Sequence, residues 1–214
     1  RDRRGISKLR PFVPTDFCDR AAQLILDHPG TAIIITGFYI LDASADETDG
    51  PPGALAIGNA LQSLGMRVTY VSDSYPTPAL REIAGGDAEV IDFAVAEPEE
   101  SMRAGIWLLD QLDPDLLLSI ERCSRSRDDT YLNMRYVDIS PNTARLDYLF
   151  DSGISSVGIG DGGNEIGMGN LVEQIPAVPS LPSEPTTTAV TQLIIASVSN
   201  WGVYGLITAL SQIS

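Results

Sequence analysis

The apolar run TAIIIT at Thr31–Thr36 constrains the fold of this chain more than any other segment. Its residues do not alternate between polar and apolar, so the strand that they form must be buried on both faces. Both-sided burial is typical of a parallel sheet that carries helices on each side. Further strands are predicted at Arg67–Ser72, Ala88–Phe93, Asp115–Ile120, Ser155–Gly160 and Gln192–Ser197.

Helical spacing, with proline near helix starts and glycine near helix ends, fills most of the intervals between these strands. The predicted helices are Thr15–Asp27, Pro51–Leu64, Pro78–Ala84, Glu97–Leu112, Thr143–Asp151 and Trp201–Gln212. Strands that alternate with helices predict a three-layer, Rossmann-like α/β domain with a mostly parallel sheet of about six strands.

The length and composition suit a single domain. The chain has 214 residues, 43% of them hydrophobic, which is enough for one sizeable core, so we expect residues 1–214 to form one unit. Residues 1–36 supply the first helix and strand. The chain starts RDRRGISKLRPF, without methionine or an apolar signal core, and we interpret it as a fragment of a longer chain.

The net charge narrows the class of partner, and the cysteines indicate the compartment. Fourteen basic and 29 acidic residues give a net charge of -15, which disfavours nucleic acid and anionic membrane surfaces as partners. No apolar run is long enough to span a bilayer. Cys18 and Cys123 lie far apart in sequence and form no disulfide framework, so we expect an intracellular, reducing location.

Scarce residue types limit the chemistry. His28 is the only histidine and Lys8 the only lysine, and His28 lies in DHPG, where a capping role at a helix end is expected. A general base must therefore come from Asp, Glu, Tyr or Cys side chains. The remaining cations are arginines, which bind carboxylate or phosphate but do not exchange protons near neutral pH.

Polar loops follow the carboxyl ends of the predicted strands, where open α/β sheets bind their ligands. After the first strand comes ADETDGPPG, in which Asp49 can cap the next helix but Glu47 has no such structural role. After Asp115–Ile120 comes ERCSRSRDDTYLNMR, which contains four arginines and suggests a small anionic ligand, such as a dicarboxylate. These arginines are Arg122, Arg125, Arg127 and Arg135.

The stretch GIGDGGNEIGMGN, at 158–170, matches the glycine spacing of a dinucleotide-binding loop. A nucleotide is nevertheless disfavoured, because Asp161 would face a pyrophosphate and no strand ending in an acid follows at the required distance. We interpret Asp161 and Glu165 as two carboxylates presented to a pocket or a metal, with Asn164 capping a helix that carries Glu165. The three glycines Gly160, Gly162 and Gly163 would let the backbone approach a ligand. A glycine-rich turn with no ligand is the alternative.

Five motifs together resemble the C-terminal domain of the D-glutamate cyclase family. They are ETDGPPGA at 47–54, SIER at 119–122, TYLNMR with DIS at 130–140, GIGDGGNEIGMG at 158–169 and SNWGVYGL at 199–206. The resemblance covers residues 37–214. The sequence departs from the family at Cys123-Ser124, where Pro-Gly is expected, and at Tyr136, where a small residue is expected.

The resemblance implies a lyase that cyclises D-glutamate to 5-oxo-D-proline with loss of water. Because the family includes vertebrate mitochondrial proteins and stand-alone microbial ones, it implies a location in the mitochondrial matrix or the cytoplasm. An enzyme of the same fold acting on another small acidic metabolite, or a non-catalytic domain that binds a small anion or amino acid, are the alternatives.

The reaction itself suggests roles for these residues. Proton transfer would fall to Asp161, Glu165, Glu47 and Glu121, since histidine and lysine are nearly absent. Substrate binding would fall to Arg122, Arg135, Gly160, Gly162, Gly163, Asn164 and Asn200. Alternatively, Asp49, Asp161 and Glu165 would bind a divalent cation, Mg²⁺ or Mn²⁺, that polarises the carboxyl group.

Overall fold

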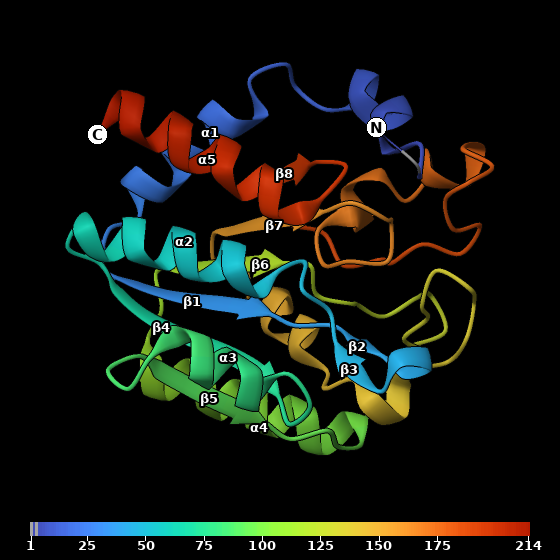
Figure 1. Cartoon of the computed structure of the whole chain (residues 1–214), viewed down its shortest axis with the longest axis horizontal. Coiled ribbons are helices and arrows are strands. Elements are labelled where there is room, and N and C mark those ends of the chain that lie inside the picture. The colour runs from blue at the N-terminus through green and yellow to red at the C-terminus, as the bar shows by residue number, and fades with distance from the viewer. Residues whose placement is uncertain (1, 3) are drawn as a thin grey trace.

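The computed structural model describes residue 2 and residues 4–214, and its centre is a parallel sheet of six strands with helices on both faces (Figure 1). This arrangement confirms the predicted three-layer α/β fold. The strands of the sheet are β1 (Thr31–Thr36), β4 (Arg67–Asp73), β5 (Glu89–Phe93), β6 (Leu116–Ile120), β7 (Ser156–Gly160) and β8 (Gln192–Ile195). A short antiparallel pair, β2 (Tyr39–Ile40) and β3 (Ala45–Asp46), lies outside the sheet.

The helices agree with the sequence patterns at most positions. The α-helices of the described residues are α1 (Phe17–Asp27), α2 (Pro51–Ser63), α3 (Thr77–Ala84), α4 (Pro98–Leu112) and α5 (Ser199–Ile213). The 3₁₀ helices are η1 (Ile6–Phe12), η2 (Leu41–Ala43), η3 (Ser140–Asn142), η4 (Leu146–Ser152), η5 (Met168–Leu171) and η6 (Ile175–Ala177). No helix in this part of the chain has the length and apolar character to cross a membrane.

The α-helix expected at Thr143–Asp151 is wrong, because this segment forms the 3₁₀ helix η4. Its buried residues Leu146 and Leu149 are three apart, which matches three residues per turn and sets both against the sheet. The predicted strands and the other five helices predicted between them differ from the structure only by shifts of one or two residues at their ends.

The order of the strands in the sheet is β5-β4-β1-β6-β7-β8. The chain builds outward from β1 in one direction to β4 and β5, then returns to add β6 on the other side of β1. Loops after β1 and β6 therefore leave in opposite directions, and the space between them is where such sheets bind ligands.

Two apolar cores hold the helices onto the sheet. One core lies between the sheet and α1, α2 and α5, and the other between the sheet and the helices α4 and η4. In Figure 1, α2 and α5 lie on one side of β1 and β6, and α4 lies on the other. His28 occupies the end of α1, as expected, where its Nδ1 atom is 2.8 Å from the carbonyl oxygen of Leu24.

A third apolar cluster attaches the first residues of the chain to the end of the sheet. Ile6 and Leu9 of η1 are buried against a group of apolar side chains from η5, η6 and β8. These partners are Met168, Leu171, Ile175, Leu193 and Ile195. This packing fixes the N-terminal segment beside the loop that follows β7.

Candidate active site

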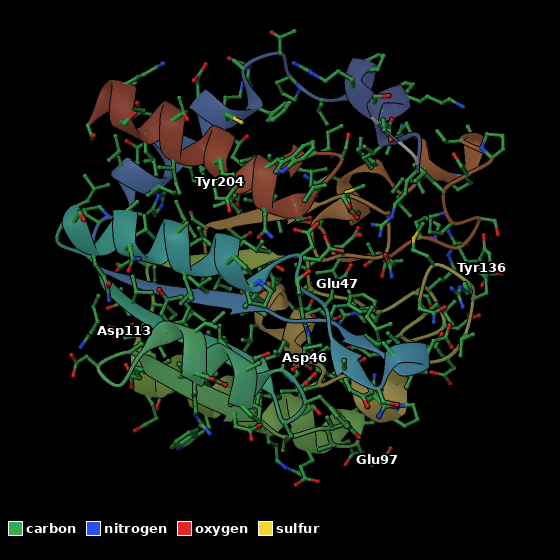
Figure 2. The ribbon with its side chains drawn as sticks, in the orientation of Figure 1. Asp46, Glu47, Glu97, Asp113, Tyr136 and Tyr204 are labelled. Carbon is green, nitrogen blue, oxygen red and sulfur yellow. The ribbon has the colours of Figure 1, made fainter. Side chains whose placement is uncertain are left out.

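Four loops meet at the carboxyl end of the sheet, after β1, β6, β7 and β8. The first three of these loops, with Arg4 from the N-terminal segment, line a cavity of about 210 Å³. Its charged lining residues are Arg4, Asp42, Glu47, Glu121 and Arg135. Figure 2 shows Glu47 on the segment that leads from β3 into α2, at this end of the sheet. The cavity thus lies at the switch point between β1 and β6, as the strand order requires.

Three carboxylates form the centre of the site. Single oxygen atoms of Asp49, Glu121 and Asp161 all lie within 4.8 Å of one another. Glu165 is completely buried beside them, and Glu47 adds a further carboxylate to the cavity wall. Three strand-end segments that are distant in sequence therefore place five acids around one small volume. We call this group, Glu47, Asp49, Glu121, Asp161 and Glu165, the acid cluster.

Glu121 is held in place by its backbone and by α5. It follows β6 directly, its N–H donates to the carbonyl oxygen of Ile159, and its side chain accepts a hydrogen bond from the Ser199 hydroxyl. Its φ is 47°, in the left-handed region that residues with a side chain seldom adopt. Such conformations concentrate at functional sites, where the surrounding structure must hold them.

Crowding and burial keep protons on these carboxyls. Burial raises the pKa of Asp161 to about 8, with a further contribution from the charge of Glu165, while Arg4 opposes the shift. Burial also raises the pKa of Glu121 well above its ordinary value, and the neighbouring acids add to this effect. The pKa values of Glu165 and Glu47 are raised by burial as well. The acid cluster therefore offers a proton donor at neutral pH.

Arg4 is a site residue that the sequence patterns did not indicate. Its guanidinium forms an ion pair with Asp161 and lines the cavity. No local motif marks this arginine, because it reaches the cluster across 157 positions of the chain. The only available signal was a basic start, RDRR, in a strongly acidic chain.

The glycines of the loop after β7 make room for a carboxylate and do not form a cradle for a ligand. A Cβ atom on Gly160 would lie 2.9 Å from Glu165 Oε2, and one on Gly162 would lie 2.7 Å from Glu165 Oε1. Gly163 has a φ of 105°, and its N–H donates to Glu165 Oε2 at 2.7 Å. This N–H thus contacts the protein's own acid, which differs from the ligand contact suggested by the sequence.

A helix carrying Glu165 was also predicted, and this prediction is wrong. Glu165 instead forms an isolated β-bridge with Cys123, and the Asn164 side-chain amide donates to the carbonyl oxygen of Leu132 at 2.9 Å. Asn164 therefore ties the β7 loop to the loop after β6 while it lines the cavity.

Replacing Gly160 by alanine is expected to lower the free energy of unfolding by about 1–3 kcal/mol, because the new Cβ would overpack the Glu165 and Met168 side chains. Urea unfolding of the purified protein measures this loss. Gly86→Ala is the matched control, since a Cβ there meets nothing within 4 Å. Equal stability of the two variants would contradict the packing role of Gly160.

Asp49 and Asn200 cap each other's helices. The Asp49 carboxylate accepts hydrogen bonds from the N–H groups of Ser199 and Asn200, so it caps α5 and not α2 as the sequence suggested. In return, Asn200 Oδ1 accepts from the N–H groups of Gly50 and Gly53 at the start of α2. The Asn200 amide group also donates to the carbonyl oxygen of Thr48. Asn200 is thereby engaged in structure, which leaves little of it for a substrate.

The arginines of the loop after β6 have separate positions. Arg122 is buried and bonded to Asp73 and to the carbonyl oxygens of Gly37 and Ala144, so its predicted contact with substrate carboxylates is not supported by its surroundings. Arg125 pairs with Asp147 and Asp151, away from the cavity wall. Arg135 does line the cavity, where it pairs with the exposed Asp42.

The acid cluster also has the composition of a cation site. Carboxylate oxygens are the ligands that Mg²⁺ and Mn²⁺ prefer. The three acids whose oxygens converge include Asp49 and Asp161, as predicted, but the third is Glu121 in place of Glu165. Glu165 packs against Gly160 and Gly162 of the loop after β7 and is not one of the three converging acids.

The fold and the site define an α/β protein with a buried carboxylate centre at the strand ends, suited to proton transfer on a small molecule. The chain belongs to the family described as D-glutamate cyclase-like, C-terminal, whose model matches residues 1–214. It is 33% identical over 208 residues to the human protein named D-glutamate cyclase, mitochondrial. That alignment covers 88% of this chain and 34% of the human protein, so the chain spans about a third of its relative.

Proposed function

We propose that this domain is a lyase that cyclises D-glutamate to 5-oxo-D-proline. The observation that carries the proposal is the convergence of Asp161, whose pKa burial raises to about 8, with Asp49 and with Glu121, which lines the cavity. Pairs of carboxyls with separated pKa values are how enzymes supply an acid and a base at one site. Membership of the family, and the name of the human relative, supply the substrate.

The reaction suits a site built from carboxyls. The amino nitrogen of D-glutamate bonds to the side-chain carboxyl carbon, and one carbon–oxygen bond breaks. The ammonium group gives up two protons overall, and the departing oxygen takes up two to leave as water. Catalysis thus needs groups that accept protons from the nitrogen and donate protons to the oxygen. The reaction consumes no second substrate.

Two acids of the cluster fit these roles. Protonated Asp161 donates a proton to the departing oxygen, because it still holds a proton at neutral pH. Glu47 accepts a proton from the ammonium group; its raised pKa makes its carboxylate a stronger base than an exposed one. Burial of Asp161 keeps its pKa high, and the charge of Glu165 raises it further.

A bound Mg²⁺ or Mn²⁺ would change the distribution of these roles. Asp49, Glu121 and Asp161 would hold it, and it would polarise the substrate carboxyl group as a Lewis acid. Asp161 would then be ionised by the cation, and Glu47 would remain available as the base.

Incubation of the purified protein with D-glutamate tests the proposal. We expect proton NMR to show 5-oxoproline forming from D-glutamate and much more slowly from L-glutamate. Treatment with a chelator, followed by addition of Mg²⁺ or Mn²⁺, separates the two versions: full activity after chelation supports Asp161 as the acid, and activity restored by the cation supports the metal. Absence of 5-oxoproline under all these conditions would refute the proposed reaction.

A further inference from the structure

Arg4 is brought to the cavity by a firmly held segment. Its carbonyl oxygen accepts a hydrogen bond of 2.6 Å from the Ser180 hydroxyl. The Asp2 carboxylate accepts hydrogen bonds from the N–H groups of Gly5 and Ser7, and η1 buries Ile6 and Leu9 directly afterwards. Arg4 and the backbone that follows it are therefore fixed, and the arginine side chain lines the cavity.

The cavity presents few cations to an anionic ligand. Among the described residues that line it, Arg4 and Arg135 carry positive charge, and Arg135 lies at the exposed rim with 74% of its side chain accessible. Arg4 lies within the electrostatic field of four acids: Asp161, Glu121, Glu165 and Glu47. A dicarboxylate that enters this acidic cavity needs a cation, and Arg4 is the less exposed of the two, with 39% of its side chain accessible.

The contact between Arg4 and Asp161 leaves most of the guanidinium group for another partner. The ion pair is formed by Nη1 and one carboxylate oxygen. A guanidinium has five N–H donors in a planar fork that matches a carboxylate in a two-pronged manner. A substrate carboxylate can offer Arg4 that geometry, which Asp161 does not.

We propose that Arg4 is the substrate-carboxylate ligand of this site, and that the substrate takes it over from Asp161 on binding. The identity of the ligand as a dicarboxylic amino acid rests on the proposed function. The geometry assigns Arg4 a specificity role, because it favours ligands with a carboxylate over neutral molecules of the same size. It also assigns Asp161 two partners in turn, Arg4 in the free protein and the reacting group in the complex.

Titration calorimetry with glutarate tests this inference without requiring turnover, since glutarate has both carboxylates and lacks the amine. For the unmodified protein at neutral pH we expect measurable binding of glutarate. Arg4→Gln is expected to weaken this binding by roughly ten- to a hundredfold, the value of a charge-assisted hydrogen-bonded pair. Arg4→Lys keeps the positive charge but loses the planar fork of donors. Its affinity for glutarate is expected to lie between those of the unmodified protein and Arg4→Gln.

Two further variants complete the design. Lys8→Gln removes one positive charge from the same segment at an exposed position, and is expected to bind glutarate as the unmodified protein does. Asp161→Asn is expected to bind glutarate at least as tightly as the unmodified protein, because no carboxylate then competes for Arg4. Unchanged affinity in Arg4→Gln, or no glutarate binding by the unmodified protein, would overturn the inference. Arg4-dependent binding without conversion of D-glutamate would uphold it and refute the proposed reaction.

Discussion

Asp161→Asn is expected to lower kcat for D-glutamate cyclisation on the order of a hundredfold to ten-thousandfold, the contribution typical of a positioned general acid. Asparagine has nearly the same shape but cannot hold and release the proton that the departing oxygen needs. Initial rates of 5-oxoproline formation, measured for both proteins at saturating D-glutamate, give the ratio. Asp87→Asn, which removes an exposed carboxylate far from the cavity, is the matched control and is expected to be fully active.

Asp161→Asn also changes how the free energy of unfolding depends on pH, and this change distinguishes loss of catalysis from loss of folded structure. Because the folded-state pKa of Asp161 is raised to about 8 from an unfolded value of 3.8, the folded protein binds more protons between these limits. Stability from this group is therefore full at acidic pH and is lost as pH rises through about 8. Asp161→Asn should be the more stable protein at about pH 9, while Asp87→Asn should not. Turnover of Asp161→Asn close to that of the unmodified protein would contradict its role as the acid.

Arg122→Met is expected to lower the free energy of unfolding by about 3–5 kcal/mol, because it breaks a buried ion pair by removing one partner. Both side chains of the Arg122–Asp73 pair are 1% exposed, and the two charged atoms are 2.5 Å apart. Without the guanidinium, Asp73 keeps a buried charge, and the carbonyl oxygens of Gly37 and Ala144 lose a donor. Urea unfolding of the variant measures the loss.

The control for Arg122 is an ion pair on the surface. Arg20 of α1 pairs with Asp16 at 2.9 Å with about half of each side chain exposed, so Arg20→Gln should lower the free energy of unfolding far less than Arg122→Met does. A loss for Arg122→Met as small as that for Arg20→Gln would show that Arg122 does not hold the β6 loop in place, and would reopen the prediction that it binds substrate.

The layered fold could be predicted from the sequence because it depends on local patterns. The run Thr31–Thr36 is apolar throughout, and the structure buries all six of its residues. Strand ends of a parallel sheet must share one edge, so the sequence also predicted that acids after different strands would meet. Glu47, Glu121 and Asp161 do meet there.

The role of each site residue could not be predicted from the sequence, because these roles depend on contacts between distant segments. The sequence does not distinguish the roles of Arg122 and Arg135. Only the structure shows that Arg122 forms a buried ion pair with Asp73. The capping exchange between Asp49 and Asn200 joins residues 151 positions apart. The glycines of the β7 loop resembled a ligand cradle, whereas Gly160 and Gly162 accommodate the Glu165 side chain.

The central claim is that Asp161 holds a proton at neutral pH in the middle of an acid cluster. NMR of protein labelled with ¹³C at the aspartate side-chain carboxyls, titrated in metal-free buffer, observes this proton directly. The account predicts one aspartate carboxyl signal that titrates at a pH of about 8 and is missing from Asp161→Asn. Titration of every aspartate carboxyl below about pH 5, near the ordinary range of the residue, would contradict it.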